Sequence, residues 1–403
     1  MSPDARSPHH RGLDRRAFLK LLGLAGASAW LSACQAVKAP ELTPTPAASA
    51  TLPAPTSSPV PTATLTPAPT ATTLPSASPT PSFPYTAAIA QAACYDLDVL
   101  RPALLDVLDN LPGLRDLVKP GARVAIKANL TGGTWWDTPD RPPATEFFVT
   151  HPAVVGVLCE WLRDAGAARL VVVDGLGDAT SFDVWGYRAM AEPLGVELVD
   201  LCKPDPYPGY YRFPVQGEPL AYDFFYLNGV MREVDLLFSV AKMKCHTTTG
   251  VTLSMKNLFG MVPISEYRNS PAENNRSAFH ESTAFDTRVP KVILDLNRAV
   301  PVRFALIDGI FTAEAGAGPW DARMSQVKPG LLVAGLNPVA VDAAAAALMG
   351  FDPTAQAGVS PFVGSDNHLN LAREMGLGSN RLEEIGILGP SIEQARFPFQ
   401  PAR

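Results

Sequence analysis

One stretch, residues 234–263, constrains the fold of this 403-residue chain more than any other. It opens with an apolar, β-prone run over residues 236–240 that is typical of a buried strand. Lys242, Lys244 and His246 follow at alternate positions, so an extended backbone would place all three side chains on one face. A buried strand that ends in basic side chains is typical of open α/β sheets, which bind ligands just outside the carboxyl ends of their strands. The alternative is a solvated edge whose lysines discourage sheet-to-sheet pairing.

Apolar segments with helical spacing alternate with short β-prone runs over residues 85–403. This alternation predicts a single α/β domain built on a mixed, largely parallel sheet with helices on both faces. The expected strands cover residues 123–127, 170–173, 196–201, 236–240, 302–307 and 331–334, and the expected helices cover 99–111, 152–165, 184–194, 338–349 and a segment that starts at 290.

The first 34 residues predict an export signal rather than part of the fold. Arg15 and Arg16 lie in a twin-arginine pattern, and the apolar run that follows, residues 21–31, is too short to span a bilayer. The run ends in Leu-Ser-Ala-Cys, which resembles a lipoprotein cleavage box with Cys34 as the acylated residue. We therefore expect the twin-arginine machinery to export the protein, and a lipid on Cys34 to anchor it to the membrane on the extracytoplasmic side. The alternative is a plain cleaved signal in which Cys34 is incidental.

Residues 35–84 consist almost entirely of proline, threonine, alanine and serine, with Lys38 and Glu41 as the only charges. Such a segment cannot bury enough apolar surface to offset the entropy lost on ordering. Its proline content favours extended polyproline conformations. We expect a disordered stalk between the anchor and the folded domain.

The charge balance argues against a nucleic-acid partner. The chain carries a formal charge of −6, and residues 1–34 contribute +3 to it, so residues 35–403 carry −9. Nucleic-acid binding requires a basic footprint, which an acidic domain does not offer. A local basic cluster on such a domain favours a small anionic ligand.

Four cysteines follow Cys34, and none belongs to a Cys-x-x-Cys pair. An iron–sulfur cluster or a zinc ribbon is therefore not indicated. Cys159 lies on an apolar helical face and is expected in the core. An even number of cysteines outside the cytoplasm would permit a disulfide, but the spacing selects no pair.

Lysines and asparagines form the predicted anion site. Ammonium groups brought together without an anion repel one another by several kcal/mol in a low-dielectric site. Their convergence would imply a phosphate, a polycarboxylate or neighbouring aspartates, and asparagine side chains would orient the ligand through hydrogen bonds. The alternative for each lysine is a solvated surface charge. The predicted ligand-binding residues are Lys127, Asn129, Lys242, Lys244, Lys256 and Asn257.

Histidines supply the candidates for proton transfer. His246 and His280 lie in the central polar region, where an imidazole can act as a general acid or base near neutral pH or can bind a metal. A purely structural role is the alternative for both. His151 precedes a proline at a helix start and is expected to be a turn or cap residue, and His368 is expected on the surface.

Aspartates follow two predicted strands and precede glycines. Asp174 and Asp308 would thus lie where carboxylates meet a hydroxyl-bearing ligand or a divalent metal, with Asp308 as the metal candidate. Asp342 lies in the first turns of a predicted helix, whose dipole alone explains a negative charge there. The glycine-rich residues 316–319 form either a loop that approaches a ligand or a tight turn.

These motifs together resemble the domain of unknown function 362 family. The matching pieces occur in order over most of residues 120–350: Lys127-x-Asn129, His151-Pro152, Lys242-x-Lys244-x-His246, residues 251–260 with Lys256-Asn257-Leu258-Phe259-Gly260, His280, Ile307-Asp308-Gly309, Gly316-x-Gly318-Pro319, and residues 338–342. The activity of that family is not generally settled, so the resemblance implies a fold more than a reaction. Some relatives carry ferredoxin-type cysteine clusters, and this chain has no such cluster.

Three functions are compatible with the sequence. The first is an exported, lipid-anchored enzyme that acts on an anionic small molecule, with lysines holding the anion and His246 or His280 moving a proton. The second is a tethered, non-catalytic lipoprotein that binds an anionic metabolite or cofactor. The third is a structural protein of the cell envelope, which a dispersed arrangement of the lysines and histidines would favour.

Overall fold

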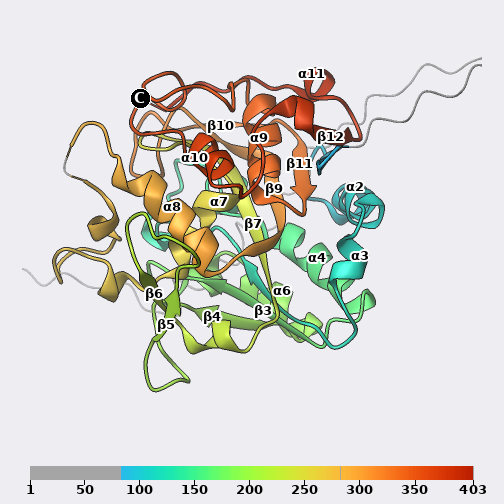
Figure 1. Ribbon diagram of the computed structural model, residues 1–403. Helices are drawn as coiled ribbons and strands as arrows, with labels where there is room; N and C mark the ends of the chain where they lie inside the picture. Colours follow the sequence, from blue (N-terminus) through green and yellow to red (C-terminus); the bar gives the residue numbers. More distant parts are fainter. Residues whose placement is uncertain (1–82, 282, 403) are drawn as a thin grey trace, which may run out of the picture. The chain divides into compact units, whose positions relative to one another are not determined.

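The computed structural model describes residues 83–281 and 283–402, so the predicted signal and almost all of the predicted stalk lie outside the described residues. A ten-stranded sheet forms the centre of the described part, with the strands in the order β12-β1-β11-β9-β7-β2-β3-β4, β10 beside β9 and β8 beside β7 (Figure 1). The strands of this sheet are β1 (Tyr85–Gln91), β2 (Arg123–Lys127), β3 (Arg169–Asp174), β4 (Glu197–Asp200), β7 (Leu236–His246), β8 (Gly250–Thr252), β9 (Val302–Glu314), β10 (Ser325–Val327), β11 (Leu331–Gly335) and β12 (Ile385–Leu388).

Parallel pairing dominates the main path of the sheet. The successive pairs from β9 through β7, β2 and β3 to β4 are all parallel, and β1 pairs in parallel with β12. Only β11 runs antiparallel to both strands beside it. The predicted mixed, largely parallel sheet is therefore confirmed.

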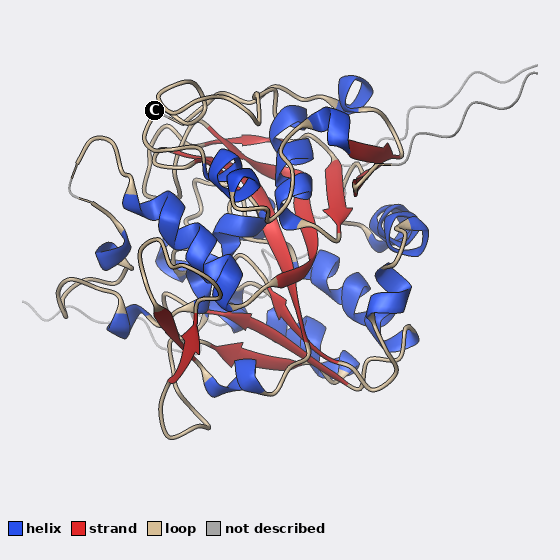
Figure 2. Cartoon of the chain, in the orientation of Figure 1, coloured by secondary structure: helices blue, strands red, loops and turns tan. Residues whose placement is uncertain are grey.

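Helices cover both faces of the sheet, as predicted (Figure 2). Helices α2 to α6 pack on one face of the sheet, and helices α7 to α11 pack on the other face. The helices are α2 (Leu97–Asn110), α3 (Leu114–Leu117), α4 (Pro152–Asp164), α5 (Ser181–Val184), α6 (Tyr187–Leu194), α7 (Ser254–Asn257), α8 (Arg288–Ala299), α9 (Pro338–Leu348), α10 (His368–Glu374) and α11 (Ile392–Ala395).

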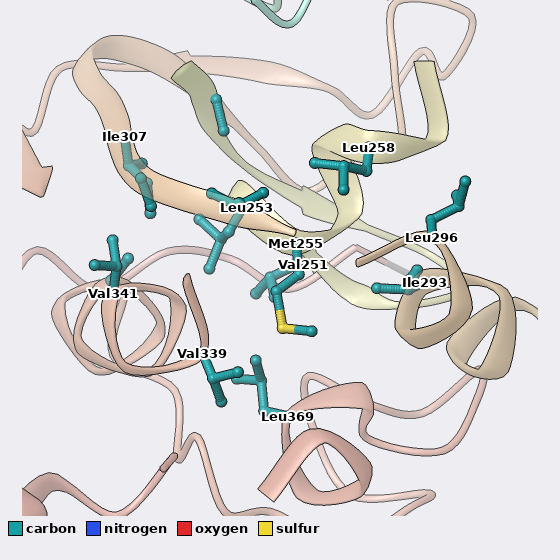
Figure 3. Close-up of a cluster of buried hydrophobic side chains, with 14 of the residues drawn as sticks. Val251, Leu253, Met255, Leu258, Ile293, Leu296, Ile307, Val339, Val341 and Leu369 are labelled. Carbon is teal, nitrogen blue, oxygen red and sulfur yellow. The ribbon is translucent and has the colours of Figure 1, made fainter. Parts of the chain in front are cut away.

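Strand β7 shows how the sequence pattern separates the two faces. Phe238 and Val240 pack into the core beneath α2–α6, whereas Ala241 and Met243 pack into the core beneath α7–α11. The side chain of Lys242 lies on the same face of the strand as Phe238 and Val240. The predicted alternation of side chains along β7 is therefore confirmed. Figure 3 shows part of the second core, to which β8, α7, the residues that flank α7, α8, β9, α9 and α10 contribute the labelled side chains Val251, Leu253, Met255, Leu258, Ile293, Leu296, Ile307, Val339, Val341 and Leu369.

Some elements differ from the sequence prediction. The expected helix over 184–194 is two helices, α5 and α6, because Gly186 between them adopts a left-handed φ of 75°. Strand β9 continues past Ile307 to Glu314, which places Asp308 inside a strand rather than after one. The excursion over residues 204–226 contains a separate hairpin, β5 (Tyr211–Pro214) with β6 (Phe224–Leu227).

The prediction that His368 is exposed is wrong. His368 is the first residue of α10 and is fully buried, because α10 packs against α8 and α9. Its ring contacts the ring of Phe362 edge-on, and neither of its nitrogens has a hydrogen-bond partner among the described residues. Burial, with a smaller effect from the charge of Lys256, lowers the pKa of His368 to about 3, so the ring is neutral in the folded protein at physiological pH.

The cysteines of the described part are free thiols. Cys159 is fully buried on α4, as predicted, and Cys245 is buried on β7. Cys94 and Cys202 are partly exposed. No helix within residues 83–281 and 283–402 is both long enough and apolar enough to span a membrane.

Candidate functional site

A cavity of about 750 Å³ opens where three neighbouring parallel strands end. β2 ends at Lys127, β3 at Asp174 and β7 at His246, and all three residues line the cavity. The chain that follows β7 adds Thr252 from β8 and Lys256 from α7. The cavity therefore lies where open α/β sheets bind their ligands.

Lys127 and Asp174 form a buried ion pair in the cavity, with 2.8 Å between Nζ and Oδ1. The carboxylate of Asp174 also accepts hydrogen bonds from the backbone N–H groups of Leu130 and Gly175, at 2.6 and 2.7 Å. Burial lowers the pKa of Lys127, and the charge of Asp174 opposes that effect. The two charges cancel, so this pair adds no net charge to the cavity.

Lys244 and Lys256 have no such partner in the part of the chain that the structure describes. Lys244 Nζ donates a hydrogen bond to the carbonyl oxygen of Phe148 at 3.0 Å, and Lys256 Nζ lies 5.1 Å from the centre of the Phe259 ring. Among the described residues, neither ammonium group has a carboxylate within 4.0 Å. Burial lowers the pKa of Lys256 to about 7. Burial, followed by the charge of Lys256, lowers the pKa of Lys244 well below its ordinary value.

Arg276 is a further cation at the cavity, which the sequence prediction missed. Its Nε donates to the carbonyl oxygen of Val262 at 2.8 Å, and its Nη2 lies within 3.5 Å of the carbonyl oxygens of Gly175 and Gly260. These carbonyl groups fix the guanidinium without neutralising it. Arg276 lies in a polar loop with no periodic pattern, so no signal in the sequence indicated this position.

The two predicted asparagines lie beside each other. Asn129 Nδ2 donates to Asn257 Oδ1 at 3.1 Å, and Asn257 Nδ2 donates to the carbonyl oxygen of Lys127 at 2.9 Å. The amide of Asn257 is therefore occupied by protein groups. Asn129 Oδ1 and Thr252 Oγ1 are buried at the cavity and have no hydrogen-bond partner among the described residues. These two oxygens can pair with polar groups of a ligand.

The hydrogen bonds of His246 determine its tautomer. Its Nδ1 accepts a hydrogen bond from the backbone N–H of Thr248 at 3.1 Å. Burial, followed by the charge of Lys256, lowers the pKa of His246 well below its ordinary value, so the ring is neutral. A neutral imidazole that accepts at Nδ1 carries its proton on Nε2. His246 therefore offers a hydrogen-bond donor to a ligand.

His280 has the opposite arrangement. Its Nδ1 lies 3.2 Å from Oδ2 of Asp286, and the same carboxylate accepts from the backbone N–H groups of Glu281, Arg288 and Val289. A carboxylate oxygen only accepts hydrogen bonds, so His280 Nδ1 is the donor in this contact. Burial and the charge of Lys256 lower the pKa of His280, and Asp286 opposes them. The neutral ring then exposes a lone pair on Nε2, which can accept a proton.

Lys242 and Asp308 lie apart from the cavity lining. Lys242 Nζ is 3.0 Å from Asp308 Oδ2, and both side chains are fully buried. The ammonium group also donates to the hydroxyl of Tyr95 at 2.8 Å, and that hydroxyl donates to Asp308 Oδ1 at 2.8 Å. The backbone N–H of His151 donates to Oδ2 at 3.0 Å. Lys242 thus has an acidic partner of its own, and we no longer assign it to the ligand.

The placement of Asp308 also removes the observation that made it a metal candidate. Its oxygens accept from an ammonium group, a phenol and backbone N–H groups. Within residues 83–281 and 283–402, no three His, Cys, Asp or Glu side chains converge as a metal site would require. The structure therefore gives the predicted role of Asp308 no support.

Asp342 positions the short helix that carries Lys256. Its carboxylate accepts hydrogen bonds from the backbone N–H groups of Ser254 and Met255, each at 2.8 Å. These groups begin α7, so Asp342 caps a neighbouring helix rather than stabilising its own. Burial raises the pKa of Asp342 to about 7, and the two N–H groups oppose that rise. His151, by contrast, caps its own helix as predicted, because its Nδ1 accepts from the N–H of Ala153.

The fold and this arrangement of residues define a family. Residues 124–347, more than half of the chain, match the domain of unknown function 362, and the chain belongs to that family. It is similar to a thylakoid-associated protein of Synechocystis sp., with 24% identity over 276 residues, which are 66% of this chain and 75% of that protein.

Solved structures resemble this chain only distantly. A lactate racemase apoprotein from Thermoanaerobacterium thermosaccharolyticum has a TM-score of 0.35 and 12% identity, over 61% of this chain and 54% of that one. A protein from Thermotoga maritima has a TM-score of 0.30 and 10% identity, over 62% and 57%. The chain thus spans little more than half of each solved structure, and neither likeness bears on its activity.

Proposed function

We propose that the cavity binds a small molecule with a phosphate or carboxylate group, and that the protein is an enzyme acting on this molecule. Lys244 and Lys256 carry the proposal, because they are basic side chains in one cavity without an acidic partner among the described residues. Two ammonium groups in this cavity would repel each other, and burial lowers the pKa of both lysines. An anionic group between them would offset that repulsion. Arg276 adds to the positive potential.

The histidines support proton transfer as the reaction. His280 Nε2 has no hydrogen-bond partner within residues 83–281 and 283–402 and can accept a proton, and Asp286 would stabilise the imidazolium that forms. His246 Nε2–H is available to donate a hydrogen bond to an oxygen of the ligand. We propose His280 as the general base and His246 as the hydrogen-bond donor. A base and a donor beside a cationic anion site suit removal of a proton next to a carboxylate or phosphate group.

We expect Asp286→Asn and His280→Gln to lose turnover by about 100-fold or more while they retain the ligand, because general-base catalysis contributes about 10²–10⁴-fold. Native mass spectrometry of the full chain, purified under mild conditions, would identify the retained anion. NMR of that anion in D₂O would then report proton exchange or conversion by wild type and variants.

The result separates an enzyme from a binding protein. Slow exchange in both variants at unchanged affinity supports the enzyme. Wild-type protein that binds the anion but neither exchanges nor converts it would be a tethered, non-catalytic binding protein. Protein without any retained anion, and without affinity for phosphate or dicarboxylates, would contradict both proposals.

We also propose that the protein is exported and anchored by a lipid on Cys34, which lies outside the described residues. The twin-arginine pattern and the Leu-Ser-Ala-Cys sequence support this proposal. Growth with labelled palmitate should label wild-type protein and leave Cys34→Ala unlabelled. Equal labelling of both proteins would contradict the lipid anchor.

A further inference from the structure

Two tryptophans at the mouth of the cavity have no part in the chemistry proposed above. Trp135 and Trp320 line the cavity, and each is 51% exposed. They are among the most exposed large apolar side chains of the described part. Exposed aromatic rings around a cavity are typical of a surface that a ligand covers.

Each ring packs against a glycine two residues before it. A Cβ atom on Gly133 would lie too close to the six-membered ring of Trp135, and a Cβ atom on Gly318 would lie too close to that of Trp320. The two loops therefore share a Gly-x-Trp arrangement, in which the missing side chain makes room for the indole. The position of each ring thus depends on its glycine.

Contacts connect the loop that carries Trp135 and Trp136 to the loop that carries Trp320, and we call these three residues the rim of the cavity. The rings of Trp136 and Trp320 meet edge to face, with 6.5 Å between their centres. Arg141 Nη1 donates a hydrogen bond to the carbonyl oxygen of Pro319. Next to Trp135, the backbone N–H of Thr134 donates a hydrogen bond to Asp178 Oδ2 at 2.6 Å. Hydrogen bonds thus hold the backbone on which the rings sit.

From this rim we infer that the ligand is an anion that carries a planar ring, such as an aromatic carboxylate or a nucleotide. The inference rests on the proposed function, because the lysines bind the anionic group while Trp135 and Trp320 contact the ring. A cavity of about 750 Å³ has room for both parts. Stacking of a ring on an aromatic side chain strengthens binding by roughly 5- to 150-fold in affinity, which corresponds to about 1–3 kcal/mol.

Calorimetry with matched anions tests the ring requirement. Phthalate and cis-cyclohexane-1,2-dicarboxylate carry the same two carboxylates, but only phthalate is planar. AMP and ribose 5-phosphate form the corresponding phosphate pair, so the two pairs also distinguish a carboxylate site from a phosphate site. We expect the full chain to bind the planar member of at least one pair about tenfold more tightly.

Variants of the rim residues test whether the tryptophans cause the preference for the planar anion. Trp135→Leu/Trp320→Leu should remove the preference for the planar anion and leave the affinity for its non-planar partner within about twofold. Gly318→Ala should reduce the preference while it keeps every ring, because the new methyl group displaces the indole of Trp320. Leu97→Ala, which removes an exposed apolar side chain outside the cavity lining, should change neither affinity.

The outcomes also separate this inference from the proposed function. Equal affinity for planar and non-planar anions would overturn the aromatic ligand and leave the anion site intact. A preference that survives in Trp135→Leu/Trp320→Leu would place the ring elsewhere and would also overturn the inference. Absence of binding for all four anions would contradict the proposed function itself.

Discussion

We expect Lys256→Met to weaken anion binding by at least tenfold and, at the same time, to raise the free energy of unfolding by about 1–2 kcal/mol. In the free protein the Lys256 ammonium group is desolvated without an acidic partner among the described residues, and methionine preserves most of its apolar stem. A bound anion would lose a charge-assisted hydrogen bond that stabilises binding by about 1.5–3 kcal/mol. Calorimetry with phosphate and chemical denaturation of the same two proteins measure both changes.

Lys119→Met is the matched control, because it makes the same substitution at an exposed position outside the cavity lining. It should change neither binding nor stability appreciably. A Lys256→Met variant that is less stable than wild type, with unchanged anion affinity, would show that Lys256 is a structural cation with a partner of its own.

Because the pKa of Lys256 is lowered to about 7, the affinity for the anion should depend on pH. In the free protein this group loses its proton as pH rises through about 7. A bound anion stabilises the protonated form, so anion affinity should fall as pH rises from 7 to 9, and binding at pH 8 should take up a proton. Calorimetry in buffers of different ionisation enthalpy detects that proton. Affinity that is constant over this range in wild type would contradict the assignment.

The second large effect concerns the buried pair outside the cavity. We expect Asp308→Ala to lower the free energy of unfolding by about 3–5 kcal/mol, because Lys242 would remain buried without a counter-charge. Lys242→Met/Asp308→Leu should recover most of that loss, since it removes both charges and keeps apolar volume. Urea denaturation of the wild type, Lys242→Met, Asp308→Leu and the double variant measures the coupling between the two residues.

The exposed pair of Arg188 and Asp183 is the control for that cycle. Arg188→Ala should change stability by less than about 1 kcal/mol, because water screens the exposed pair. If Asp308→Ala lowers the free energy of unfolding no more than Arg188→Ala does, the buried pair does not have the predicted effect on stability. Phosphate affinity of Lys242→Met/Asp308→Leu should remain within about twofold of wild type, and a loss beyond tenfold would return Lys242 to the ligand site.

The sequence predicted those parts of the site that local spacing controls. Alternation along β7 placed Lys244 and His246 on one face, and the end of β2 placed Lys127 at the same edge of the sheet. The chain after β7 then brought Lys256 back over that edge. Spacing could not separate Lys242 from Lys244, because both alternate positions look alike in sequence. They differ by one pleat, which places only Lys242 opposite Asp308 on the neighbouring strand.

The sequence by itself determined the central strands, the longer helices and the class of side chain at the strand ends, since the hydrophobic pattern of each such element lies within a short stretch of sequence. Only the tertiary structure decided which charges are neutralised. Lys242 and Asp308 are 66 positions apart, and their pairing follows from the order of strands in the sheet. The same holds for the rim, because Trp135 and Trp320 become neighbours of one cavity only when two distant loops meet. Whether a buried cation is free to bind a ligand depends on partners that local sequence does not specify.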